Sequence, residues 1–516
     1  MHPEATEAAP LAAPVLNVAR RRVAIGAGGL AVLLAAMDAY VVVSLFVTIL
    51  NDLSIPINHL ERATPIITGY LLGYVAGMPL LARISDRYGR RIVIYVSLAG
   101  FAAGSALTAS AHSVNLLVAG RALQGLAGGA LLPVTMALAA DLFAEANRST
   151  VLGGVGAAQE LGSVLGPLYG IGLAALVGWR GIFWVNIPLA AVAALAVYWA
   201  VPARSRHDDG ERPRVDVVGG LLIAVALALA IVALNNQHPE SGILPTWGPE
   251  LLVCSGVLLV GFVLWEWRAR TKLLELASVD RGVFFAALGA SLCAGAALMV
   301  TLVFVQLSGQ EVMGKSAAAS TLLLARFLVA LPIGAVAGGY AVRWIGARWT
   351  GFVGLIVAGL GYVLIARWPL AVLSDPYRLG PVRLPQLDTS LVITGLGLGL
   401  VIAPLSVAVL RVVPAASHGI ASAALVVARM LGMLIGVAAT VAWGLHRFQV
   451  LTANLPTPLP LPGMTDATYA KEINAYTHAV LVAYHSEYHS VFLVTAAVCA
   501  AGALMTLALG GRRANA

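Results

Sequence analysis

The sequence predicts an all-α integral membrane protein with about fourteen transmembrane helices. Of its 516 residues, 59% are hydrophobic and only 11% are charged, against roughly 25% charged in an ordinary soluble domain. Continuous apolar runs of about 18 residues or more recur along the chain, and each is long enough to cross about 30 Å of hydrocarbon. Because polar residues do not alternate within these runs, the runs predict helices and not the strands of a barrel.

The apolar runs give the order of the expected elements. We expect spans at residues 24–50, 66–82, 92–111, 114–140, 151–176, 182–201, 217–234, 249–267, 284–307, 317–341, 349–367, 388–410, 419–450 and 489–510. These spans divide the chain into a tail at 1–23, a six-helix bundle at 24–201, a linker with two inserted helices at 202–282, a second six-helix bundle at 283–511 and a tail at 512–516.

The distribution of basic residues predicts the orientation. Arg20, Arg21 and Arg22 precede the first span, which lacks a signal-peptide cleavage pattern and is therefore expected to be retained. Most of the 32 Lys and Arg lie in the tails and in alternate short loops, which indicates that both termini are cytoplasmic. The net charge of +8 thus reflects topology, and we expect no nucleic-acid partner. The Arg- and Ala-rich composition is typical of a GC-rich bacterial genome. For a multi-pass protein of a bacterium, we expect the cytoplasmic (inner) membrane as its location.

Cysteine and histidine give no sign of an enzyme. Cys254, Cys293 and Cys499 fall inside apolar runs, without the spacing of metal ligands or redox pairs. His485 and His489 would share one helix face, which leaves weak metal binding open but supplies no catalytic constellation. We therefore expect no catalytic residues, no cofactor and no metal.

Two related segments suggest an internal repeat. DRYGRR at 86–91 follows the second span, and RWIGAR at 343–348 follows the tenth, with Gly three positions after the first charged residue in both. This weak echo is typical of transporters built from two repeats. The spans at 217–234 and 249–267 would then form an inserted pair between the halves.

The loop at 82–91 resembles the signature of the major facilitator superfamily. Asp86, Arg87, Gly89, Arg90 and Arg91 match the motif, while Ala82 stands where the family usually has Gly. We expect Asp86 to cap a neighbouring helix, because the amino-terminal end of a helix dipole favours an anion. The alternative is an ordinary basic loop on the cytoplasmic side.

Three further segments resemble the same family. RALQG at 121–125 is similar to a motif of the fourth helix, and WRGIFWVNIP at 179–188 to the start of the sixth helix in fourteen-helix members. GSVLGPLYG at 162–170 resembles the motif of the drug/proton antiporter branch, with its matching positions at Gly162, Gly166, Pro167 and Gly170. The resemblance implies the major facilitator fold of two six-helix bundles plus an inserted pair.

Ionisable residues inside the spans are the main candidates for function, since a charge at mid-bilayer costs at least about 2.5–3.5 kcal/mol. Counted from the cytoplasmic ends of their helices, Glu160 and Arg429 both lie about 15 Å deep. The resemblance places them on opposite halves, so we predict an ion pair across the interface that protonation of Glu160 would release. The alternative is that each residue bonds within its own half.

Asp38 and Arg121 form a second candidate pair, because their expected depths are similar. The resemblance assigns Arg121 to proton transfer, and the alternative is a purely structural buried pair. Arg326 has no evident partner at its level, so it either lines or gates the cavity or extends its guanidinium outward towards the membrane surface.

The composition of two helices favours an apolar cargo. The resemblance implies that 284–307 and 388–410 line the cavity, yet their polar side chains are few: Ser291, Thr301, Gln306, Thr394 and Ser406. Gln306 is the largest of these and a candidate cavity or gating residue. A sugar or amino-acid site would need several converging polar groups, because unpaired polar groups are costly when buried.

The two last helices are predicted to extend outside the membrane, at about 445–489. No proline interrupts 420–455, and neither Gly nor Pro interrupts 466–501, so both helices can exceed the bilayer thickness. Tyr469, Tyr476, Tyr484 and Tyr488 recur at helical spacing on one face. We expect an antiparallel pair whose tyrosine face guides cargo or docks a partner; the alternative is that this face only packs on the preceding helix.

The extension resembles that of the mycobacterial triacylglycerol/multidrug exporter group. The resemblance implies a proton-coupled exporter of hydrophobic molecules, with a lipid such as triacylglycerol as cargo, and a periplasmic lipid-carrying lipoprotein as partner. The alternative is a multidrug/proton antiporter that exports amphipathic drugs. We expect protons and membrane lipids as further partners and a monomer as the working form.

Overall fold

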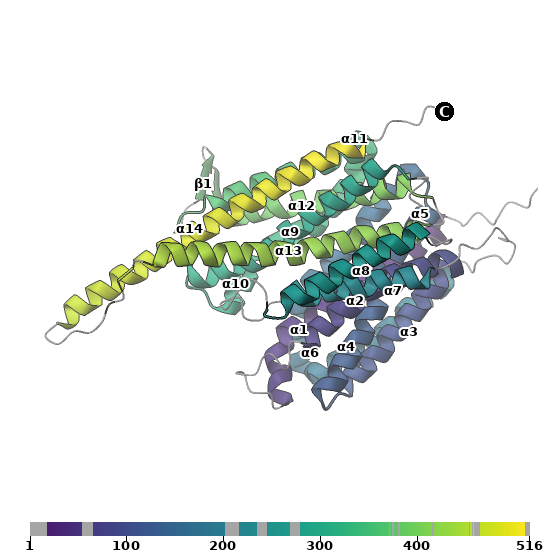
Figure 1. Cartoon of the computed structure of the whole chain (residues 1–516), viewed down its shortest axis with the longest axis horizontal. Helices are drawn as coiled ribbons and strands as arrows, with labels where there is room; N and C mark the ends of the chain where they lie inside the picture. Colours follow the sequence, from purple (N-terminus) through teal and green to yellow (C-terminus); the bar gives the residue numbers. More distant parts are fainter. Residues whose placement is uncertain are drawn as a thin grey trace, which may run out of the picture.

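The computed structural model describes residues 18–53, 65–201, 216–234, 245–268, 279–370, 372–373, 376–379, 382–414, 417–453, 455–456, 458 and 465–510. The C-terminal tail, most of the N-terminal tail and most of the charged loop at 204–216 lie outside these ranges. The described chain is almost wholly helical (Figure 1).

The first half contains α1 (Val18–Asp52), α2 (Pro65–Tyr88), α3 (Arg90–Ala109), α4 (Val114–Gly129), α5 (Leu131–Leu142) and α6 (Glu145–Ala200). Then follow α7 (Val217–Leu234) and α8 (Gly248–Arg268). The second half contains α9 (Arg281–Glu311), α10 (Ala317–Leu323), α11 (Ala325–Ala366), α12 (Gln386–Val412), α13 (His418–Thr452), α14 (Asp466–Thr506) and a short 3₁₀ turn at Leu507–Leu509.

Two of these helices are too long to be single spans. The 56 residues of α6 would measure about 84 Å as one rod at 1.5 Å per residue, far more than the bilayer. Each long helix is interrupted by a glycine with positive φ, Gly178 (φ 70°) in α6 and Gly346 (φ 76°) in α11. These glycines fall in the predicted connections between spans, where L side chains would be strained.

Eleven helices in the described part of the chain are long and apolar enough to cross a membrane. α6 covers both predicted spans 151–176 and 182–201, and α10 with α11 covers both 317–341 and 349–367. Because each of these continuous helices contains two predicted spans, the eleven helices do not give a count of crossings. The count of fourteen stays a prediction.

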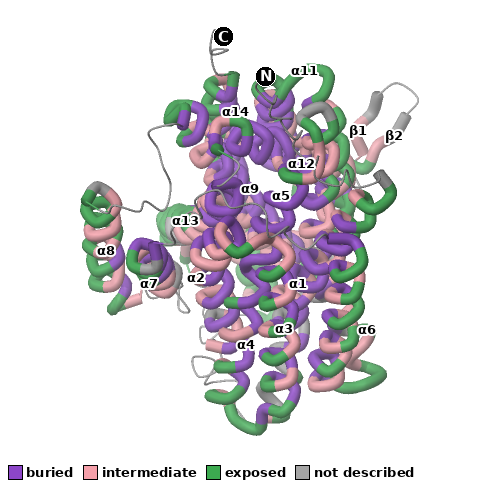
Figure 2. Tube along the Cα trace, turned by 90° about the vertical axis from the view of Figure 1, so that its right-hand side faces the viewer, coloured by how far each residue is buried: buried purple, intermediate pink, exposed green. Residues whose placement is uncertain are grey.

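The inserted pair lies outside the main body. α7 and α8 pack on each other, and α7 contacts α2. Figure 2 shows both helices beside the bundle, with exposed residues along much of α8. α7 also contacts α13 of the second half, so the inserted pair lies beside the seam between the two halves.

Two features lie at the end of the bundle opposite the 82–91 loop. A two-stranded antiparallel sheet of β1 (Pro376–Leu379) and β2 (Val382–Pro385), which the sequence did not predict, precedes α12. The first part of α14 projects well beyond the other helices (Figure 1). Phe448 of α13 stacks on Tyr484 of α14 with ring centroids 4.3 Å apart, so the two long helices are paired at the base of this projection.

Candidate functional site

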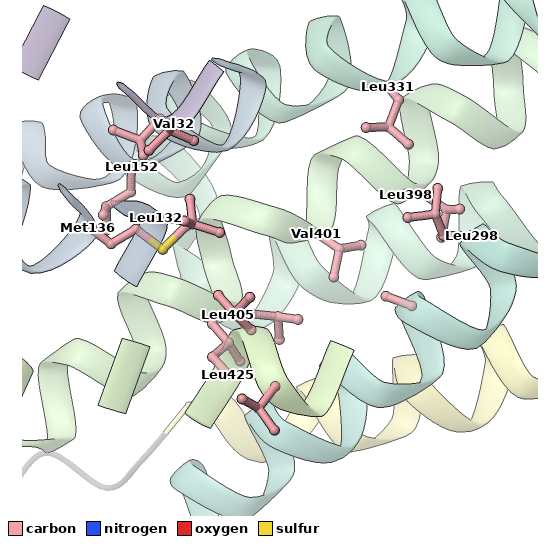
Figure 3. Close-up of a cluster of buried hydrophobic side chains, with 14 of the residues drawn as sticks. Val32, Leu132, Met136, Leu152, Leu298, Leu331, Leu398, Val401, Leu405 and Leu425 are labelled. Carbon is pink, nitrogen blue, oxygen red and sulfur yellow. The ribbon is translucent and has the colours of Figure 1, made fainter. Parts of the chain in front are cut away.

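A small cavity lies where the halves meet. It has a volume of about 40 Å³ and is lined by α5, α6, α9, α11, α12 and α13, mostly through apolar side chains. Figure 3 shows this lining, with Leu132 and Met136 from the first half and Leu298, Leu398, Val401 and Leu405 from the second. Ser291 and Ser406, two of the five polar residues noted in the sequence, also line it.

Glu160 and Arg429 face each other at this cavity. Nη2 of Arg429 lies 2.8 Å from Oε1 of Glu160, and their side chains are 16% and 6% exposed, respectively. Glu160 belongs to α6 and Arg429 to α13, so the structure brings the predicted pair together across the halves. The two partners are bound to different bodies, and a change in the charge of Glu160 therefore acts directly on the contact between those bodies.

A series of contacts between the halves leads from the 82–91 loop to this pair. The amides of Gly419 and Ile420 donate to the carboxylate of Asp86, at 3.0 and 3.4 Å. Asp86 therefore caps α13 as the helix dipole favours. Arg90 bonds Asp86 and also Asp141, the latter at 3.1 Å. These groups close this end of the molecule.

Small residues continue the series towards the cavity. A Cβ on Gly153 of α6 would lie 2.6 Å from the carbonyl oxygen of Ala335 of α11. A Cβ on Gly156 would lie 2.5 Å from the side chain of Ile402 of α12. The halves thus touch closely from the loop up to Glu160, which indicates that the structure is closed on this side.

Arg87 and Arg91 of the loop are half-buried and lie over tyrosine rings. Arg87 lies over the Tyr88 ring, with its guanidinium carbon 5.3 Å from the ring centroid, and Arg91 lies over Tyr198 at 5.1 Å. Gly89 has φ 100°, a conformation that favours glycine and lets α3 start directly after α2.

The second predicted pair is the centre of a buried polar cluster within the first half. Nη1 of Arg121 lies 2.5 Å from Oδ2 of Asp38, and the two residues are 1% and 2% exposed. Gln124 and Asn186 donate to Oδ1 of Asp38 at 3.2 and 2.7 Å. The guanidinium carbon of Arg121 also lies 4.2 Å from the centroid of Tyr70. Asp38 is therefore neutralised and hydrogen-bonded from several helices at once.

Glycines of the antiporter motif pack α6 against α1. A Cβ on Gly162 would lie 2.7 Å from the carbonyl oxygen of Leu33, and one on Gly166 equally close to that of Met37. Gly170 is buried too, while the side chain of Pro167 lies outside the described residues. The segment of α6 that follows Glu160 therefore packs directly on α1, the helix that carries Asp38.

Two of the predicted cavity residues lie elsewhere. Arg326 points to the outer face of the second half, where its Nε lies 2.9 Å from Oδ1 of Asp388. Gln306 is half-buried in α9 and does not line the cavity. For Arg326 this is the outward alternative that the sequence left open, because depth alone does not give the direction in which a helical side chain points. A cavity or gating role for Gln306 stays a prediction.

The tyrosine face of α14 has two different environments. Tyr488 is buried, contacts the carboxylate of Glu311 at the end of α9, and packs edge-on against Phe304. Tyr469 and Tyr476 lie on the projecting part and are only partly buried. The base of the tyrosine face therefore packs on neighbouring helices, while its outer part stays accessible.

The histidines near this end bond to the backbone. Nε2 of His485 lies 2.6 Å from the carbonyl oxygen of Trp368, and Nδ1 of His489 lies 2.8 Å from that of Ala366. Since a carbonyl only accepts, both rings donate and anchor α14 to the end of α11. Within the described ranges, no group of three or more His, Cys, Asp or Glu could hold a metal ion.

Sequence reasoning missed several members of these sites. His418, 3.4 Å from Asp141, and Ser417, which accepts from Arg83 at 3.3 Å, add to the closed end. Asn186 lies within the motif at 179–188, but its bond to Asp38 crosses 148 residues of sequence. The Tyr488–Glu311 contact joins helices whose pairing the helical pattern does not specify.

Apolar spanning helices, two halves that meet at a small cavity and an ion pair between those halves define a multi-pass membrane transporter. The family comparison agrees: residues 28–437 match the model of the Major Facilitator Superfamily. The chain belongs to this superfamily, as the sequence motifs predicted.

Close relatives extend over nearly the whole chain. A triacylglyceride transporter of Mycolicibacterium hassiacum is 53% identical over 503 residues, covering 96% of this chain and 93% of the relative. A triacylglyceride transporter of Mycobacterium tuberculosis is 51% identical over 504 residues, covering 96% of each.

Solved structures share the fold at low identity. The human organic anion transporter MFSD10 aligns with a TM-score of 0.60 at 17% identity, over 93% of this chain and 99% of that one. The proton:xylose symporter XylE aligns with a TM-score of 0.56 at 14% identity, over 93% and 95%.

Proposed function

We propose that this protein is a proton-coupled exporter of a hydrophobic lipid such as triacylglycerol, working by alternating access in the bacterial inner membrane with both termini in the cytoplasm. The observation that carries the coupling is the Glu160–Arg429 ion pair, which joins the two halves beside the cavity. The names of the relatives and the apolar lining support the lipid cargo.

The geometry supports a simple coupling step. A proton on Glu160 removes the attraction for Arg429, whose guanidinium stays charged at any physiological pH. The contact between α6 and α13 then loses the Glu160–Arg429 bond, and the halves can separate on the closed side. Deprotonation remakes the pair and restores the state described here.

The site favours an apolar cargo over a polar one. Of the residues that line the cavity, only Gln159, Glu160, Ser291, Ser406 and Arg429 are polar, and two of these are used in the ion pair. A triacylglycerol presents little more than acyl chains and ester groups, so it leaves few buried polar groups unpaired. The accessible outer part of α14 is then a route for acyl chains to a lipid-carrying lipoprotein.

Coupling is tested in vesicles with a pH gradient and a fluorescent triacylglycerol. We expect Glu160→Gln and Arg429→Ala to abolish proton-driven transfer, while Glu250→Gln, an exposed matched control on α8, transfers lipid at the wild-type rate. Wild-type transfer by both interface variants would reject the proposed coupling.

Cargo is tested by extraction of lipids from the purified protein and by drug efflux from cells. We expect co-purified triacylglycerol, and loss of its transfer when residues 466–485 are deleted or when Tyr469 and Tyr476 are both changed to Ser. Tyr340→Ser, an exposed tyrosine on α11, is the matched control. Drug efflux without bound or transferred lipid would instead identify a multidrug/proton antiporter.

A further inference from the structure

A second hollow lies on the outer face of the second half, apart from the cavity between the halves. It is an open groove of about 550 Å³ between α11 and α12, within the roughly 300–1,000 Å³ of small-molecule sites. Val329, Ile333, Val392 and Leu396 line it, and the first two are 55% and 57% exposed. The groove therefore faces the surroundings of the bundle and can accept an acyl chain.

The first half of α11 runs parallel to α12 in a fixed register. A Cβ on Gly334 would lie 2.4 Å from the carbonyl oxygen of Leu396, and one on Gly338 equally close to that of Leu400. Residues 62 positions apart thus lie side by side along both helices. The same offset places Arg326 beside Asp388, above the apolar lining.

Arg326 and Asp388 close one end of the groove. Asp388 is in the first turn of α12, whose other end leads to α13 and the Asp86 contact. The pair therefore lies at the end of the bundle opposite the 82–91 loop. Nε of Arg326 lies 2.9 Å from Oδ1 of Asp388, and their side chains are 44% and 39% exposed.

An ion pair that is exposed on the outer face of a membrane protein can bind further polar groups, because part of each charged side chain is not covered by protein. Arg326 uses its Nε to bond Asp388 and one Nη to donate to the carbonyl oxygen of Leu322 at 3.2 Å. Guanidinium N–H groups bind phosphate well, and a carboxylate accepts from an ammonium. Arg326 and Asp388 carry opposite charges, so the pair as a whole has no net charge.

From this juxtaposition we infer that the groove binds one zwitterionic phospholipid with a primary ammonium, such as phosphatidylethanolamine. Its phosphate lies on Arg326, its ammonium lies on Asp388, and one acyl chain fills the groove along Val329 and Ile333. The site is separate from the transport cavity and does not depend on the identity of the cargo.

The charge arrangement selects against other head groups. An anionic lipid such as phosphatidylglycerol would bring its phosphate to Arg326 without a cation for Asp388. Phosphatidylcholine carries a cation whose methyl groups cannot donate a hydrogen bond. A neutral triacylglycerol has no phosphate for Arg326. The wild-type protein should therefore bind phosphatidylethanolamine at least about tenfold more tightly than phosphatidylglycerol, phosphatidylcholine or triacylglycerol. A tenfold difference in affinity corresponds to about 1.4 kcal/mol.

The test is native mass spectrometry of the full-length protein, titrated with each of these lipids carrying identical acyl chains. Arg326→Gln should weaken binding of phosphatidylethanolamine about tenfold. Asp388→Asn should remove the preference over phosphatidylglycerol. Ile333→Trp should block the acyl chain, whereas Val336→Trp, exposed on the same helix but outside the groove, should bind as the wild type does.

Thermal denaturation run in parallel identifies any variant that is unfolded, so each binding result either supports or rejects the groove site. A preference for phosphatidylethanolamine that both Arg326→Gln and Ile333→Trp lose supports the site. Stronger binding of phosphatidylglycerol or triacylglycerol by the wild type, or equal loss in Val336→Trp, would overturn it. If the groove site fails while proton-driven lipid transfer persists, the proposed function is unaffected.

Discussion

Two buried acid–arginine pairs in this transporter differ in how they are held. Asp38 and Arg121 are at most 2% exposed, and Gln124 and Asn186 hold the same carboxylate from within the first half. Glu160 and Arg429 belong to different halves, and the Arg429 side chain remains 16% exposed at the cavity. The first pair is part of one rigid body; the second joins two bodies.

This difference separates stability from coupling. Proton uptake by Asp38 would disturb bonds that all lie within one half, so its main effect is on the internal packing of that half. Under the proposed function, proton uptake by Glu160 would weaken the contact between the halves and leave each half intact. A buried pair is useful as a switch only where its partners can move apart.

The largest expected effect is on the first pair. Arg121→Ala leaves the Asp38 carboxylate buried without its guanidinium, and breaking a buried pair costs about 3–5 kcal/mol. Equilibrium unfolding in mixed micelles should show this loss. Arg326→Ala removes an exposed arginine and should cost at most about 1 kcal/mol. Equal losses would break the comparison, because burial would then not distinguish the arginines.

A smaller effect is expected from one of the other partners of Asp38. Asn186→Leu keeps the approximate shape but removes a hydrogen bond to a charged group, worth about 1.5–3 kcal/mol. The same unfolding assay should register this loss, while Asn115→Leu, exposed near the start of α4, should change little. An unchanged stability in Asn186→Leu would mean that Asp38 is not held in the manner described.

The smallest effect is expected at the interface. Gly153→Val places side-chain atoms against the backbone of α11, and overpacking costs about 1–3 kcal/mol. The closed end should then open. A cysteine introduced at Ser406, which lines the cavity, should react faster with a thiol-labelling reagent. At Gly154 a Cβ meets nothing within 4 Å, so Gly154→Val should label as the parent does.

The helices and both pairs could be predicted because apolar length, charge depth and motif spacing are properties of the sequence. Ten residues of helix give about 15 Å of depth, which was enough to match Glu160 with Arg429. The turns at Gly178 and Gly346 also fall between predicted spans, although they are tighter than the expected loops.

The features that the sequence did not predict depend on which way each helix is rotated about its axis and on which distant segments contact each other. Depth did not show that Arg326 faces outward, and Asp388 was interpreted as a helix boundary and not as its partner. Asn186 and His418 contribute through contacts between distant segments, which no local pattern specifies. The two-stranded sheet before α12 was missed because its strands have only four residues each.

The most direct test of the account is the distance between the halves as a function of pH. Spin labels on cysteines at Tyr88 and Trp344, both exposed and on different halves, would report the opening of the closed end in a protein whose native cysteines are replaced. The account predicts that acid lengthens this distance in the wild type and in Asp38→Asn, and that Glu160→Gln shows the long distance at every pH. A pH-dependent distance that persists in Glu160→Gln would contradict it.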